Sequence, residues 1–306
     1  MSEYNFLCQC WIAFFLSLVA LTGFYYLLRK NKREKNNFLK ILNYLEKIYC
    51  HLKDIEYGRS RRMERVDEFE EQMRKAGALH NDGLEYVYDE LFTKAKSLDD
   101  FQPIMKNAVE SFIKNHPSFS QEAYSVLTDK MFARFNKSYI FADDDLWNDD
   151  DENNFTNSQK QYLALIDKVI ASEYDVYNKI SELDNIKSLA FKNSNEEDLY
   201  FVIAAIEIAK ASICYWDKNF QKWIELRNKF EKNNNWKWIN NAITVVKKDV
   251  VGARIGLELV GGVVLFAPEV LSLKLKVIGV GGTALFYSAA NAVKQIIGKN
   301  ENNGKN

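Results

Sequence analysis

Proline is scarce in this sequence, with 3 residues among 306, and most of the 13 glycines fall in the last quarter. So few helix breakers before that quarter leave room for long helices. No alternating run of β-branched residues, which would indicate a strand, occurs between residues 78 and 139. We therefore predict an all-α fold.

Cysteine and histidine are also scarce, and the net charge is close to zero. The 4 cysteines do not form a disulfide pattern, which fits reduced thiols in the cytoplasm, and the 3 histidines are too widely spaced for a His-rich metal site. A formal net charge of −1 argues against a general affinity for nucleic acid. We expect no cofactor, no metal and no nucleic-acid partner.

Catalytic motifs are also missing. The segment Gly279-Val280-Gly281-Gly282 has neither the following Lys-Ser/Thr of a phosphate loop nor a third glycine at the dinucleotide spacing. Paired histidines, a nucleophile elbow and metal-ligand spacings do not occur. We expect a protein without catalytic activity and assign no catalytic, cofactor-binding or metal-binding residue.

The sequence does contain a charge-free run from Phe6 to Leu28, followed by a basic collar from Arg29 to Lys35. About 20 apolar residues are enough to cross a bilayer. A cleaved signal peptide is the alternative, but the residues before the run include no Lys or Arg, and the run does not end in small residues. We predict an uncleaved signal anchor. The expected anchor residues are Phe6, Trp11, Phe15, Leu18, Leu21, Tyr25 and Leu28.

Lys and Arg residues are retained on the cytoplasmic side of a membrane. The one-sided collar therefore predicts a single-pass protein with a cytoplasmic body, which in a bacterium lies at the inner membrane. By composition we divide the chain into an anchor with its collar (1–37), a coiled-coil-like helix (38–77), a helical body (78–235), a glycine-rich apolar tail (236–298) and a disordered end (299–306).

The coiled-coil-like helix has apolar residues at alternating spacings of three and four. They are Phe38, Ile41, Leu45, Ile48, Leu52 and Ile55, and the frame resumes with Val66, Phe69, Met73 and Ala76 after Arg59 and Arg62. The pattern fits a parallel homodimer through residues 38–56. It fits equally a helix that packs on its own helical body.

The body is predicted to contain several amphipathic helices with identifiable starts. Asn81-Asp82-Gly83 is expected to open one helix, Asp99 to cap the next before a stop at His116-Pro117, and Ser118 to begin a third. Thr156 with Gln159 opens a helix that extends through Ile180, and Ser194 with Glu197 opens the longest one. The acidic segment 143–155 is expected to be a solvated loop, because its like charges repel one another. Specific calcium binding is not expected, since Lys160 stands where a calcium loop needs Glu.

The tail has small residues at helix-facing intervals, which allow close approach of helix backbones. We predict two helices that form a hairpin around Pro268 to Lys276 and associate with the membrane without fully crossing it, or are buried against the body. Packing between them is assigned to Gly252, Gly256, Gly261 and Gly282.

The tail resembles the glycine-rich tails of bacteriocin-like peptides and of uncharacterised bacterial proteins at Lys248 to Ala253, Gly256, Gly261-Gly262, Pro268 and Gly279 to Gly282. The resemblance implies membrane activity or export and supplies no catalytic residue. The sequence departs from it at Arg254, Glu258, Lys274 and Lys276.

Together these features favour a membrane-anchored helical scaffold or interaction protein. Its expected partners are the lipid bilayer, a second copy of the chain and a protein that the sequence does not identify. The alternative is a toxin-like or bacteriocin-like effector whose tail acts on membranes while the body shields it.

Overall fold

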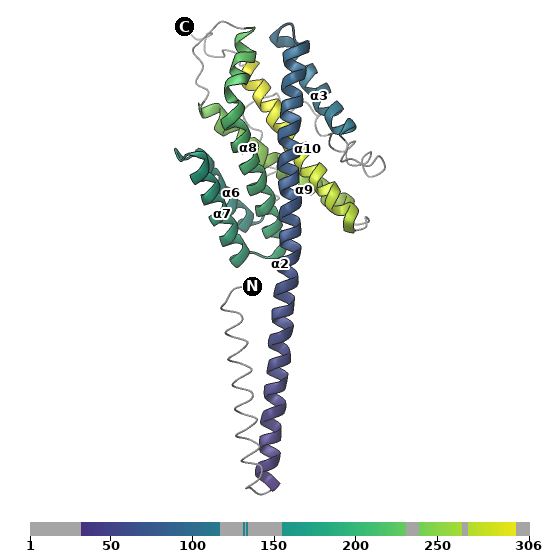
Figure 1. The fold of residues 1–306 in the computed structure, drawn as a ribbon, viewed down its shortest axis with the longest axis vertical. Helices are drawn as coiled ribbons and strands as arrows, with labels where there is room; N and C mark the ends of the chain where they lie inside the picture. The colour runs from purple at the N-terminus through teal and green to yellow at the C-terminus, as the bar shows by residue number, and fades with distance from the viewer. Residues whose placement is uncertain are drawn as a thin grey trace. The chain divides into compact units, whose positions relative to one another are not determined.

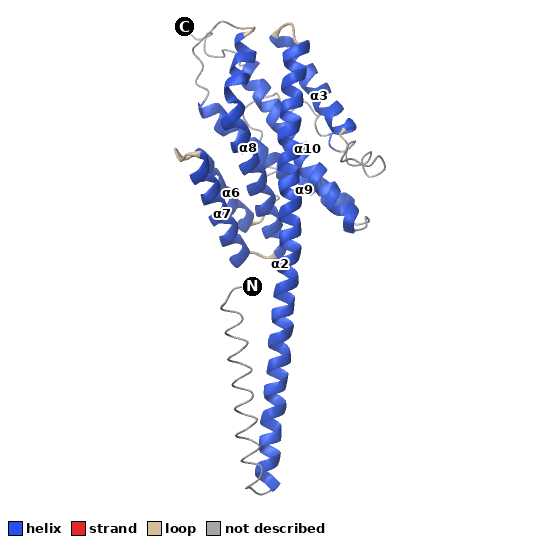
Figure 2. Ribbon diagram, viewed as in Figure 1, coloured by secondary structure: helices blue, strands red, loops and turns tan. Residues whose placement is uncertain are grey.

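The computed structural model describes residues 32–116, 131, 133, 155–230, 239–264 and 269–297 (Figure 1). These residues are almost entirely helical and include no strand, which confirms the predicted all-α class (Figure 2). The predicted anchor from Phe6 to Leu28, residues 143–154 of the acidic segment and most of the helix predicted after Ser118 lie outside the described residues.

Long helices account for most of the described chain. In order they are α2 (Lys32–Lys94), the 3₁₀ turn η1 (Leu98–Asp100), α3 (Phe101–Asn115), α6 (Asn157–Ala171), α7 (Val176–Asn193), α8 (Glu196–Asn228), α9 (Ile239–Val264) and α10 (Glu269–Ile297).

The chain divides into two compact units, an N-terminal unit from Met1 to Arg65 and a body unit from Val66 to Asn306. Within the body unit α9 pairs extensively with α10, α8 packs against both α7 and α9, and α10 also contacts α3. The glycine-rich tail therefore belongs to the same compact unit as the helices before it. Its side chains are among the most buried: every residue from Ile278 to Val293 is buried. Helix α10 begins at Glu269, so residues 269–276 are helical and the turn predicted at Pro268 to Lys276 is wrong.

Helix α2 continues through Asn81-Asp82-Gly83, so the predicted helix start at this point is wrong. Asn81 does not cap a helix, because its side-chain amide donates to the carbonyl oxygen of Ala211 at 3.1 Å. A Cβ on Gly83 would lie 2.2 Å from Cδ2 of Leu285, so this glycine serves close packing of α2 on α10. Asn81 and Gly83 are residue types that often form turns, but here they make tertiary contacts.

The helix starts that follow were predicted with mixed success. Thr156 and Gln159 form the predicted capping box, in which each side chain bonds the backbone N–H of the other residue. Helix α6 ends at Ala171, however, and a separate helix, α7, begins after Asp175. Asp175 caps α7 by accepting from the N–H of Asn178 at 2.8 Å. A continuous helix to Ile180 was therefore wrong.

The two remaining predicted caps are displaced by one or two residues. Asn195, and not Ser194, caps α8 by accepting from the N–H of Asp198 at 2.8 Å. Ser97 and Asp100 form the capping box before α3, where Asp99 had been expected. Helix α3 ends at Asn115, directly before the predicted stop at His116-Pro117.

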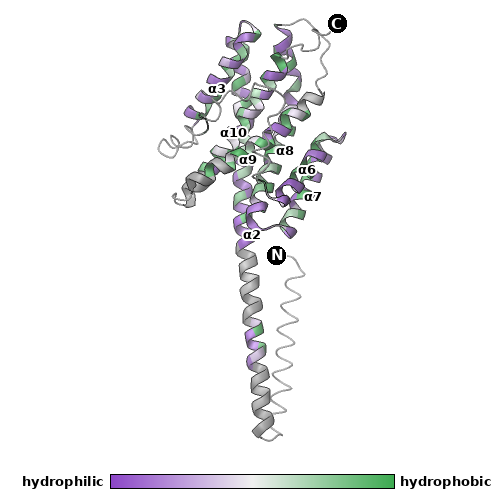
Figure 3. Cartoon of the chain, turned by 180° about the vertical axis from the view of Figure 1, so that it is seen from behind, coloured by the Kyte–Doolittle hydropathy of each residue, from purple (hydrophilic) through white to green (hydrophobic). Residues whose placement is uncertain are grey.

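Hydrophobic and hydrophilic residues both occur along α3, α6 and α7, as expected of helices with one buried face (Figure 3). Among the described helices, α8 is the one that is long and apolar enough to cross a membrane, and it is not at the N-terminus. Most of its apolar segment is buried inside the body unit, as in the core helix of a soluble protein.

Candidate functional site

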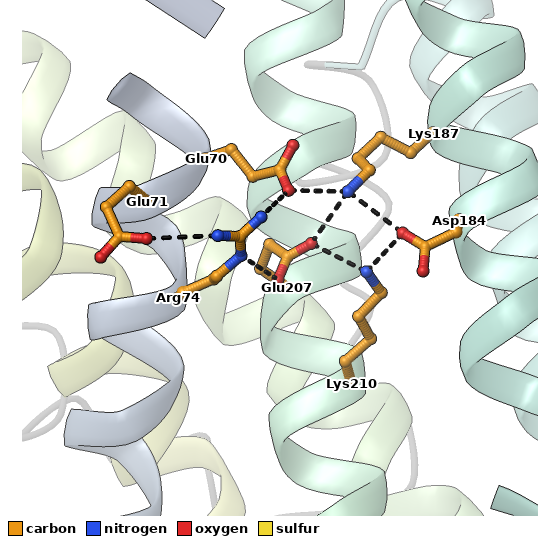
Figure 4. Close-up of polar contacts among 7 residues, drawn as sticks. All are labelled: Glu70, Glu71, Arg74, Asp184, Lys187, Glu207 and Lys210. Carbon is orange, nitrogen blue, oxygen red and sulfur yellow. Dashed lines mark hydrogen bonds and ion pairs between the residues drawn. The ribbon is translucent and has the colours of Figure 1, made fainter. Parts of the chain in front are cut away.

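Seven charged side chains of α2, α7 and α8 point toward one another in the body unit (Figure 4). We call this set the ion-pair network. It comprises Glu70, Glu71, Arg74, Asp184, Lys187, Glu207 and Lys210. Helical spacing explains its construction, because residues three or four apart share one face of a helix and each helix contributes such a group.

Lys187 occupies the centre of the ion-pair network. Its Nζ lies 2.8 Å from Oε1 of Glu70, 3.1 Å from Oδ1 of Asp184 and 3.5 Å from Oε1 of Glu207, so it joins three helices. Lys210 Nζ lies 2.6 Å from Asp184 Oδ1 and 3.0 Å from Glu207 Oε1. Arg74 pairs with Glu70 and places its Nε 3.8 Å from Oε2 of Glu207.

The pKa shifts in the network follow from these contacts. Burial alone would raise the pKa of Glu70, but Lys187 and Arg74 outweigh burial and lower it. Burial would likewise raise the pKa of Asp184, but Lys210 and Lys187 outweigh burial and lower it. The pKa of Lys187 is raised by its carboxylate partners despite its burial. The three cations are therefore held by carboxylates of the same protein, and the arrangement joins helices.

A second polar group, the buried polar cluster, lies where four helices of the body unit meet. His80 of α2, Ser212 of α8, Asp249 of α9 and Ser288 of α10 are fully buried. His80 Nε2 lies 3.3 Å from Asp249 Oδ2, and the Ser212 hydroxyl donates to the same oxygen. His80 Nδ1 lies 2.8 Å from Oδ1 of Asn81.

Burial raises the pKa of Asp249, while His80, Ser212 and Ser288 act in the opposite direction and only partly offset it. Its second oxygen, Oδ1, has no hydrogen-bond partner among the described residues. A carboxyl in such surroundings favours its neutral, protonated form.

Serine, histidine and aspartate also make up the triad of many hydrolases, but their arrangement here differs. In a triad the serine hydroxyl bonds the imidazole, which takes its proton as a general base. In this protein the Ser212 hydroxyl bonds Asp249 instead, and every member is enclosed by helices. The geometry does not activate a nucleophile, and the cluster is a polar junction in the core.

The predicted packing glycines lie at several different contacts. A Cβ on Gly252 would lie 2.8 Å from Cα of Ala284, and one on Gly256 only 2.2 Å from the carbonyl oxygen of Gly279, so both lie where α9 meets α10. Gly282 instead faces Met131 and, in α3, Ile113, so it lies at a different contact. Gly261 belongs to α9, and its surroundings fall outside the described residues.

The aromatic residues of α8 contribute to the core. Trp216 and Trp223 are buried with ring centroids 5.5 Å apart, and Tyr88 of α2 lies 5.5 Å from Trp223. The Trp223 indole donates to the Tyr215 hydroxyl at 3.0 Å. Such contacts are typical of packed aromatic side chains.

Neither polar group was identified from the sequence, because His80 and Asp249, or Glu70 and Lys187, are too far apart in the chain to form a motif. Across the described ranges, no group of three or more His, Cys, Asp or Glu residues is placed to hold a metal ion. Comparison of the chain with protein families, curated proteins and solved structures found no match.

Proposed function

We propose that this chain is a membrane-anchored helical scaffold protein that holds its body unit at the cytoplasmic face of a membrane and has no catalytic activity. The observation that carries the proposal is the use of polar side chains in the body unit. Lys187 and Lys210 contact carboxylates of neighbouring helices, and Asp249 contacts His80 and Ser212. A binding or catalytic site needs polar groups directed at a ligand. In the ion-pair network, and around Oδ2 of Asp249 in the buried polar cluster, they are directed at one another.

The membrane part of the proposal depends on the sequence between Phe6 and Leu28 and on the basic collar that follows it. A run of this length without charge is costly to expose to water and long enough to span a bilayer. The collar favours a cytoplasmic body.

The test uses the full chain in cells, with a reporter fused after Tyr57 and with carbonate extraction of membranes. We expect the protein to resist extraction and a reporter that needs the cytoplasm to be active. A matched chain lacking residues 6–28 should be released from the membrane. Activity of a reporter that needs the opposite compartment would overturn the orientation, and extraction of the full chain by carbonate would overturn the anchor.

One observation favours the effector as a second candidate. The tail helices α9 and α10 are covered by other helices of the body unit, as an effector with a shielded membrane-active segment would require. The test is dye release from liposomes by the full chain and by a peptide of residues 239–297. A scaffold should release no dye in either form, whereas release by the peptide would favour the effector.

A further inference from the structure

Between residues 43 and 49, α2 exposes large apolar side chains. Tyr44 is 72% exposed, Ile48 51% and Tyr49 44%, and Leu45 beside them is half-buried. Such a concentration of exposed apolar surface on one helix usually marks a contact with another molecule.

The heptad frame places these side chains at the four positions that line a coiled coil. Leu45 falls at a, Ile48 at d, Tyr49 at e and Tyr44 at g. The three remaining positions of the seven-residue stretch 43–49 are polar and exposed, as the outer surface of a coiled coil requires. They are Asn43, Glu46 and Lys47.

We propose that four copies of this chain associate through residues 38–56 as a parallel helical bundle. By sequence the a positions are Phe38, Leu45 and Leu52, and the d positions are Ile41, Ile48 and Ile55. Leucine at a with isoleucine at d favours trimers and tetramers over dimers, because of how these side chains pack in each geometry. Apolar side chains at e and g are buried when more than two helices meet, which fits Tyr44 and Tyr49.

Further copies of the same chain are the partners that the pattern fits best, for reasons of register. The proposal rests on the membrane anchor proposed above, because identical anchors make every copy leave the membrane at the same height and in the same direction. Identical a and d residues then face one another in register. Position g of one parallel helix also approaches position e of the next heptad on its neighbour, which brings Tyr44 near Tyr49 of another copy.

The first test uses the full chain in membranes after replacement of its native cysteines by serine. The paired substitution Tyr44→Cys with Tyr49→Cys should give an oxidative ladder that ends at four copies, because each chain bonds two neighbours. The control pair, Asn43→Cys with Lys47→Cys, lies on the outer surface and should give no ladder. Equal cross-linking of both pairs, or a Tyr44/Tyr49 ladder that ends at two copies, would overturn the proposal.

The second test changes the number of copies while keeping the surface apolar. Exchanging the a and d residues, with Leu45→Ile and Leu52→Ile combined with Ile41→Leu, Ile48→Leu and Ile55→Leu, creates the pattern favoured by dimers. The mass of the detergent-solubilised full chain should fall from four copies to two. An original chain that sediments as one or two copies, or an exchanged chain that remains at four, would contradict the proposal. The number of copies is measured separately from carbonate extraction. Failure of the proposed bundle can therefore be told apart from failure of the proposed membrane anchor.

Discussion

The Asp249 carboxyl is enclosed by α2, α8 and α10, and its pKa is raised by burial. A raised pKa means that the folded chain holds the proton more tightly than the unfolded chain. The contribution of this group to stability is therefore largest at acid pH. It declines as the pH rises from the ordinary value of 3.8 through the folded value.

We expect Asp249→Asn to leave the free energy of unfolding at pH 7 unchanged or to raise it by up to about 2 kcal/mol. The amide has the shape of the carboxyl, its oxygen accepts from Ser212, and it is neutral at every pH without taking up a proton. Denaturant unfolding of the solubilised full chain at several pH values measures this effect. The advantage of the variant should shrink toward pH 4, and Asp217→Asn, at an exposed site of α8, is the control. A difference in unfolding free energy between the variant and the original chain that does not change with pH would contradict the raised pKa of Asp249.

Gly256 tests the closest backbone approach in the tail. A Cβ at this position would lie 2.2 Å from the Gly279 carbonyl oxygen and 2.6 Å from Cα of Val280, and backbone atoms cannot move aside as a flexible side chain can. We expect Gly256→Leu to cost about 3 kcal/mol or more of unfolding free energy. Ala78→Leu, on an exposed site of α2, should change it by less than about 0.5 kcal/mol. Equal stabilities of the two variants would show that α9 and α10 do not pack this closely.

At the scale of helices, the ion-pair network joins α7 to α2 and α8 through Lys187, which is 19% exposed. Lys187→Met keeps the aliphatic stem and removes the charge, which leaves Glu70 and the nearly buried Glu207 with fewer partners. We expect a loss of about 1–3 kcal/mol in the free energy of unfolding, larger in low salt than in high salt.

The matched control for that variant is Lys75→Met. Lys75 is exposed and lies 4.0 Å from Glu71, so its removal should cost less than about 0.5 kcal/mol. The lowered pKa values of Glu70 and Asp184 add a pH test, because stability gained from a lowered carboxylate pKa is present above the ordinary pKa and is lost as the pH falls through the folded value. A Lys187→Met variant with unchanged stability at acid and neutral pH would show that the network contributes nothing.

Sequence predicted helices well where the signal was local. The Thr156–Gln159 capping box and the end of α3 before Pro117 depend on neighbouring residues, and both were recovered. The missed caps at Asp175 and Asn195 are local too, but the other failures involve residues whose role depends on distant partners. Asn81 and Gly83 resemble a helix start until the contacts with Ala211 and Leu285 are known. The two polar groups of the body unit are assembled by tertiary packing, so no spacing in the sequence indicates them.

For the whole molecule, the decisive question is whether the body unit can exist without its last described helix. Every residue from Ile278 to Val293 is buried, and α10 contacts α3, α8 and α9. A chain that ends after Val264 should therefore lose the cooperative fold of the body unit and become sensitive to protease. A chain that ends after Ile297 is the control and should resist digestion as the full chain does. Equal resistance of the two shortened chains would show that α10 is dispensable for the fold.

The interior position of α10 also has a consequence for synthesis. Ribosomes add about 5–20 residues per second, so the chain between Val66 and Ile297 takes on the order of ten to fifty seconds to make. During that interval the apolar faces of α2, α3 and α8 have no α10 to cover them. In a membrane-anchored chain, neighbouring ribosomes would hold several such unfinished bodies close together at one surface. Productive folding then depends on how quickly translation of the final segment is completed, and a pause before α10 would expose these surfaces to one another.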